Sequence, residues 1–98
     1  DFRKLATLAS RGLIATSKGR QTDFVSRGFF PQSGIDEDPV TGSAHCLLTV
    51  YWHNKTGKNT FKAIQVSARR GWLDCELNGD RVLMTGDAAL YLQGEINL

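Results

Sequence analysis

The chain has 98 residues, of which 41% are hydrophobic, a length and composition that fit one small globular domain and exclude two separate domains. The chain lacks the low hydrophobicity and high net charge that are typical of disordered chains. Its formal net charge of +2 gives no support to a nucleic-acid or anionic-membrane partner. No apolar run is long enough to cross a bilayer, and Cys46 and Cys75 form neither a CxxC pair nor a disulfide framework, so a reduced, cytoplasmic chain is expected.

The first forty residues predict a short helix, two strands and a loop. An apolar repeat at helical spacing over residues 5–9 predicts the helix. The apolar run at residues 13–16 predicts a buried strand, and a second strand is expected at about residues 23–30, where Pro31 ends it. Residues 31–39 are rich in turn and acidic residues and are expected to form a loop.

A helix is predicted at residues 43–54. Asp38, Thr41 and Ser43 are all suitable N-cap residue types, and Gly57 suits the C-cap. The segment is apolar on nearly all sides, which is typical of a helix that is buried on most of its faces.

The remaining sequence is strand-like. Apolar and polar residues alternate from Ile64 to Arg69 and from Trp72 to Leu77, and the Asn78-Gly79 pair predicts a type I′ hairpin. A last strand is expected at residues 89–93. This order predicts an α+β fold, in which a curved, mostly antiparallel, barrel-like sheet wraps around one central helix.

Residues that could take part in binding or catalysis are concentrated at positions 34–45, which lead into the predicted helix. The first N–H groups of a helix lack intrahelical partners and can hold an anion, so a substrate carboxylate fits there. Gly42 permits close backbone approach, Ser43 supplies a hydroxyl, and Asp38 is placed to orient or exchange protons with a substrate amine or hydroxyl. His45 either lines this site or makes a structural hydrogen bond. The commoner use of Asp38 or Ser43 is simply to cap the helix.

Several sequence strings resemble one known family. They are Asp23-Phe24-Val25-Ser26-Arg27, Glu37-Asp38-Pro39-Val40-Thr41-Gly42-Ser43-Ala44-His45, Gln65-Val66-Ser67 and Gly86-Asp87-Ala88. Together they resemble the C-terminal lobe of the phenazine-biosynthesis PhzF-like isomerase family across nearly the whole chain. The resemblance implies the diaminopimelate-epimerase-like fold, with two lobes that each have a barrel-like sheet around a central helix. Residues 1–98 would then form a single domain, most of the C-terminal lobe, without the N-terminal lobe.

The resemblance also implies roles for individual residues. Asp38 corresponds to a catalytic position, and Gly42, Ser43 and His45 correspond to substrate-binding positions. The implied reaction is a proton shift on a small anionic metabolite without a metal or organic cofactor, and its main acid/base is a glutamate of the N-terminal lobe. Related epimerases place a cysteine where Thr41 stands, so cysteine-based racemisation is not expected.

Two departures from the family pattern limit the expected function. Arg69-Arg70-Gly71 replaces the usual Arg-Gly-Gly, which puts a side chain at a turn that normally has none, and the chain is only about a third of a usual member. We therefore expect a substrate-binding lobe that is incomplete for catalysis alone, or alternatively a non-catalytic small-molecule-binding or protein-interaction module. Its uncovered inter-lobe face predicts a homodimer or pairing with an N-terminal lobe. His45 and His53 would lie about 12 Å apart along a helix, too far to share a metal.

Overall fold

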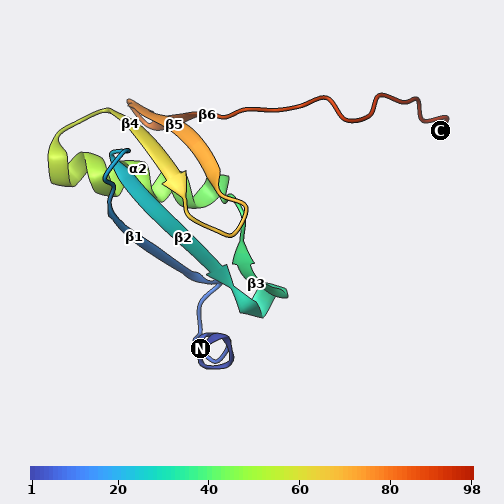
Figure 1. Ribbon diagram of the computed structural model, residues 1–98, viewed down its shortest axis with the longest axis horizontal. Coiled ribbons are helices and arrows are strands. Elements are labelled where there is room, and N and C mark those ends of the chain that lie inside the picture. Colours follow the sequence, from blue (N-terminus) through green and yellow to red (C-terminus); the bar gives the residue numbers. More distant parts are fainter.

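The computed structural model describes residues 1–98 and shows an open, mostly antiparallel sheet with one long helix (Figure 1). The predicted α+β class is confirmed, although the sheet does not close into a barrel. The elements in chain order are α1 (Phe2–Leu5), β1 (Leu13–Lys18), β2 (Phe24–Phe30), the 3-10 helix η1 (Pro31–Ser33), β3 (Ile35–Asp38), α2 (Gly42–Thr56), β4 (Thr60–Gln65), β5 (Gly71–Asn78) and β6 (Arg81–Thr85).

The order of the strands brings two distant chain segments end to end. The sheet runs β1-β2-β4-β5-β6, and only the β2–β4 pair is parallel. One edge of β2 is shared, because its first half pairs with β4 and its second half pairs with β3 in the antiparallel sense. As a result, the end of β3 at Asp38 meets the end of β4 at Gln65.

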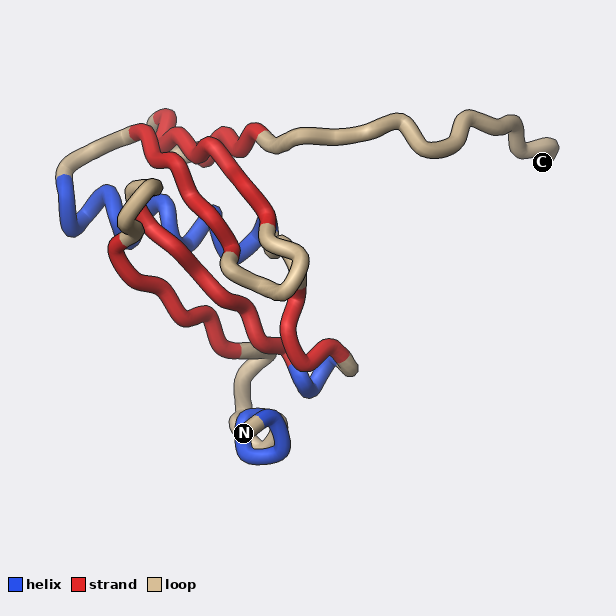
Figure 2. Tube along the Cα trace, viewed as in Figure 1, coloured by secondary structure: helices blue, strands red, loops and turns tan.

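Helix α2 lies across one face of the sheet (Figure 2), and an apolar core packs between the helix and the sheet. Phe24 is the centre of this core, with no exposed surface, and its ring stacks on Trp52 at a centroid distance of 5.8 Å. Phe61 packs edge-on against the same ring. The other members of the core cluster are Leu48, Ala63, Leu73 and Cys75.

The opposite face of α2 is uncovered, which contradicts the expectation that the sheet wraps around the helix. Leu47 is 67% exposed, and Val50 and Tyr51 are each more than 40% exposed. Val50 and Tyr51 lie three and four positions after Leu47, so the three residues form one apolar stripe along the helix. The chain supplies a sheet for only one side of a helix that is apolar on both.

The predicted strands at residues 13–16 and 23–30 and the helix at 43–54 are confirmed. Two predictions in the first forty residues were wrong in extent. The N-terminal helix α1 ends at Leu5, so only its first turn forms. The loop expected at residues 31–39 contains strand β3, which pairs with β2 and is also joined to it by a bidentate ion pair between Arg27 and Glu37.

Two predictions for the strands after α2 also need correction. The alternation predicted from Ile64 onward does not describe the burial, because Gln65 and Ser67 are buried together with Phe61 and Ala63, and Ile64 is buried as well. The hairpin after β5 forms at Gly79-Asp80, with a positive φ only at Gly79, which is the type II′ pattern rather than type I′.

No strand forms at residues 89–93, and the chain after β6 extends away from the body (Figure 1). The apolar side chains in this tail, from Leu90 to Leu98, are at least 79% exposed. The tail raises the radius of gyration to 15.5 Å, above the roughly 13 Å of a compact chain of this length. None of the helices is long and apolar enough to span a membrane.

Candidate functional site

The turn that joins β3 to α2 is held by one buried amide. Gln65, at the end of β4, is 1% exposed, and its Oε1 accepts a hydrogen bond from the backbone N–H of Thr41 at 2.7 Å. Its Nε2 donates to the carbonyl oxygen of Asp38 at 2.7 Å and to Oγ1 of Thr41 at 3.0 Å. The amide therefore bonds both ends of the turn.

Asp38 lies half-buried at the end of β3, next to this amide. Its Oδ2 accepts a hydrogen bond from the Thr41 hydroxyl at 2.5 Å, while its Oδ1 accepts none within the chain. Asp38 does not cap α2, which removes the alternative role considered for it. The free oxygen leaves Asp38 able to accept a hydrogen bond from a ligand amine or hydroxyl.

Helix α2 begins beside Asp38 with its first turn open. Thr41 is the N-cap, but its hydroxyl is engaged with Asp38 and makes no capping bond. Gly42 and Ser43 are exposed, and the first turn contains no acidic side chain. Unpaired N–H groups at the positive end of a 15-residue helix favour a bound anion.

His45 follows this turn but has no exposed surface. Its Nδ1 lies 2.8 Å from the carbonyl oxygen of Thr41, and its Nε2 lies 3.3 Å from Oγ of Ser26. Since a carbonyl only accepts, Nδ1 carries the proton and Nε2 is left to accept from Ser26. Burial lowers the pKa of His45, which agrees with a neutral ring. The structure thus gives His45 the structural hydrogen bond that was its alternative role, with no surface for direct contact with a substrate.

Two further contacts fix the same turn from the β4–β5 side. The Ser67 hydroxyl donates to the carbonyl oxygen of Pro39 at 2.8 Å. Gly71, the first residue of β5, comes so close to Val40 that a Cβ in its place would overlap the valine side chain. Sequence reasoning missed Gln65 and Ser67 as site residues, although the Gln-Val-Ser string was noted. The signal that could have found Gln65 is a polar side chain at an inward-facing strand position, whereas Ser67 follows the strand and carries no such signal.

The turn before β5 contains the departure from the family pattern. Arg70 has a φ of 64°, the only positive φ at a non-glycine residue in the chain. Its N–H is bonded to the Ser67 hydroxyl at 3.0 Å, so the turn is tightly defined. A side chain therefore occupies a left-handed position that glycine adopts more readily.

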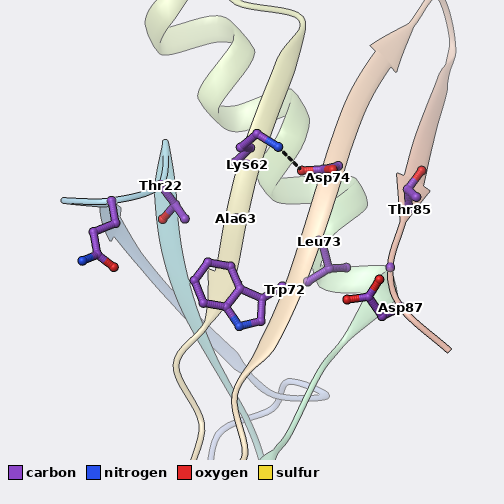
Figure 3. A pocket seen from close by; sticks show the side chains of 10 residues that line it. Thr22, Lys62, Ala63, Trp72, Leu73, Asp74, Thr85 and Asp87 are labelled. Carbon is purple, nitrogen blue, oxygen red and sulfur yellow. Dashed lines mark hydrogen bonds and ion pairs between the residues drawn. The ribbon is translucent and has the colours of Figure 1, made fainter. Parts of the chain in front are cut away.

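A separate groove of about 370 Å³ lies at the sheet, away from these residues. Its lining includes Trp72, Asp87 and the Lys62–Asp74 ion pair, as Figure 3 shows. It contains none of Asp38, Gly42, Ser43 or His45. No group of three or more His, Cys, Asp or Glu side chains is arranged to hold a metal ion.

Comparison with known proteins identifies relatives over the full length of the chain. An uncharacterized isomerase of Pseudomonas aeruginosa is 53% identical over 98 residues, all of this chain and 38% of that protein. A phenazine biosynthesis-like domain-containing protein of Rattus norvegicus is 50% identical over 86% of this chain and 32% of its own length. The crystal structure of a PhzF family protein from Enterococcus faecalis superposes with a TM-score of 0.90 at 46% identity, covering 100% of this chain and 38% of that one.

The chain thus spans about 38% of the length of the bacterial relatives that it matches. The model of the PhzC-PhzF family, described as phenazine biosynthesis-like protein, matches residues 1–94. The sequence strings, the fold and the relatives agree: this chain belongs to the PhzC-PhzF family of phenazine biosynthesis-like proteins.

Proposed function

We propose that this chain is the substrate-binding lobe of a PhzF-like isomerase, which moves a proton within a small anionic metabolite without a metal or organic cofactor. The N–H groups of Gly42 and Ser43 hold the anionic group of the substrate. The free Oδ1 of Asp38 accepts a hydrogen bond from an amine or hydroxyl beside the reacting centre and serves in the proton transfer. The main acid/base belongs to an N-terminal lobe outside these residues, so the chain binds but does not turn over by itself.

The observation that carries this proposal is the exposed start of α2 beside an unpartnered carboxylate oxygen. An anion site and a hydrogen-bond acceptor then adjoin, which selects a ligand with a negative group near a donor group. The free thiols of both cysteines support the proposed reducing, cytoplasmic setting. The description of the family supports a role in small-molecule biosynthesis.

NMR titration of the ¹⁵N-labelled chain tests the binding step. Propionate and lactate share a carboxylate, but only lactate carries a hydroxyl donor, and sodium chloride controls for ionic strength. We expect saturable shifts at the Gly42 and Ser43 amides and tighter binding of lactate, by about tenfold for one hydrogen bond to a charged acceptor. Asp38→Ala should abolish the preference for lactate, whereas the matched control Asp80→Ala, on the exposed hairpin, should keep it.

Shifts that do not saturate, or that sodium chloride reproduces, would overturn the proposal. Turnover is tested on a two-lobed protein containing this chain, incubated in D₂O with a metabolite extract. Deuterium should enter a carbon-bound position of one anionic metabolite, and Asp38→Ala should reduce that incorporation. Absence of incorporation by the unmodified protein would contradict isomerase activity.

A second candidate function is a non-catalytic module that homodimerises or pairs with another lobe. The exposed stripe of Leu47, Val50 and Tyr51 favours it, because apolar surface of this kind normally marks an interface. For the isolated chain we propose a second copy as the partner. Sedimentation should show a dimer at tens of micromolar (about the range of weak dimer constants) and a monomer for Leu47→Asp. A monomer for the unmodified chain would refute the homodimer.

A further inference from the structure

We infer that Gln65 is the positioning residue of this site, and that it acts on Asp38 through the hydroxyl of Thr41. The inference deepens the proposed function and rests on it for its biological meaning. Gln65 lies 27 positions from Asp38 in the sequence, yet its amide contacts both Asp38 and Thr41. Its own side chain is buried, so it touches no ligand.

The partners of the amide fix its orientation. The backbone N–H of Thr41 can only donate, so the atom that faces it at 2.7 Å must be Oε1. The carbonyl oxygen of Asp38 can only accept, so the atom that faces it must be Nε2. Reversing the amide would place a donor against a donor and an acceptor against an acceptor.

This orientation in turn sets the direction of the Thr41 hydroxyl. Nε2 of Gln65 donates to Thr41 Oγ1 at 3.0 Å, which leaves the hydroxyl proton free to point to Asp38 Oδ2 at 2.5 Å. The Thr41 hydroxyl is therefore occupied by Gln65 and Asp38, and it makes no capping bond to α2. A hydroxyl at the usual capping position is thus used to hold a carboxylate.

The result is a defined position for the Asp38 carboxylate. With Oδ2 bound to the N-cap residue Thr41, rotation about the side-chain torsions of Asp38 is restricted, and Oδ1 is left without a partner in the chain. Because β4 ends where β3 ends, the amide can hold the turn without any contribution from the exposed face. The site is therefore fixed before a ligand arrives.

Thr41→Val is the cleanest test, because it preserves the branched shape and removes only the hydroxyl link. The three-bond couplings between Hα and Hβ of Asp38 report its χ1 rotamer in the absence of ligand. We expect a single rotamer in the unmodified chain and in Thr41→Ser, and averaged couplings in Thr41→Val. Thr56→Val, the same change at the far end of α2, is the matched control and should keep the single rotamer. Gln65→Met should also give averaged couplings if it folds.

A single Asp38 rotamer in Thr41→Val, or in folded Gln65→Met, would overturn the inference, and so would averaged couplings in the unmodified chain. Loss of the roughly tenfold preference for lactate in Thr41→Val, with its recovery in Thr41→Ser, would support the positioning role in binding. If neither acid binds but the rotamer pattern is as expected, the proposed function fails and the positioning role of Gln65 stands. If binding persists unchanged while Asp38 stays locked, the inference fails alone.

Discussion

Gly71→Ala tests how tightly β5 is fitted against the turn that carries the site. A Cβ at this position would overlap Cγ2 of Val40 and would lie 2.9 Å from its Cβ and 3.1 Å from its Cγ1. The φ of Gly71 is not in the left-handed region, so alanine causes no backbone strain of its own. Steric overlap with Val40 is then the dominant unfavourable effect.

The size of the effect follows from two opposing contributions. Overpacking of this kind costs about 1–3 kcal/mol, because neighbouring groups must shift or leave their rotamers. Replacing glycine by alanine where the backbone permits it stabilises by about 0.4–1 kcal/mol through the unfolded chain. We expect the free energy of unfolding to fall by about 1–2 kcal/mol.

Urea unfolding followed by tryptophan fluorescence measures this change, because Trp52 is stacked on the core residue Phe24. Gly86→Ala is the matched control, since a Cβ there would be 3.6 Å from its nearest neighbour, an ordinary contact. Val40→Ala removes two of the three carbon atoms that crowd the new Cβ, including the nearest one, so the two substitutions together should show a coupling energy of about 1–2 kcal/mol. Equal costs of Gly71→Ala with and without Val40 would refute the reasoning.

The same unfolding experiments test two further predictions, each with its own control substitution. Burial lowers the pKa of His45, so just below pH 6.5, the ordinary pKa of histidine, the unfolded state binds more protons than the folded state. The free energy of unfolding should therefore fall as the pH is lowered through this range, by at most about 1.4 kcal/mol per pH unit. His45→Gln should remove this dependence and His53→Gln should keep it; an unchanged slope in His45→Gln would contradict the assignment. Arg70→Gly should stabilise the chain by about 0.5–1 kcal/mol, since relief of the left-handed conformation outweighs the added freedom of glycine when unfolded. Arg69→Gly lacks that relief and should destabilise, so equal effects at the two arginines would count against it.

Local sequence patterns predicted most of the elements that pack directly on one another. The apolar run of β1, the length of β2 ending at Pro31 and the C-cap of α2 at Gly57 were each readable from a few neighbouring residues. The tail after β6 was not, because its apolar residues satisfy a strand pattern while having no neighbouring strand in the chain. A pattern reports what a segment can form, and pairing decides whether it does.

Strand β4 shows why the site was harder to predict than the fold. Alternation counted from Ile64 places Gln65 on the polar side, whereas the strand buries Ala63, Ile64 and Gln65 in succession. The acidic run of β3 similarly hides a strand, because pairing with β2 overrides the low strand preference of aspartate. The sequence pointed to Asp38, Gly42 and Ser43 as candidate site residues, but Gln65, whose amide joins Asp38 to Thr41, lies in another strand.

The buried polar residues around the start of α2 explain how a small domain can keep this site in one arrangement. Ser26, His45, Thr49, Gln65 and Ser67 are all at least 92% buried, and no buried side-chain nitrogen or oxygen lacks a hydrogen-bond partner. Apolar side chains of similar size would fill the same space but would leave the backbone groups of Asp38 and Thr41 without their partners. The core around Phe24 therefore stabilises the fold, while the hydrogen bonds that run from Ser26 through His45 and Thr41 to Gln65 hold the start of the helix next to Asp38.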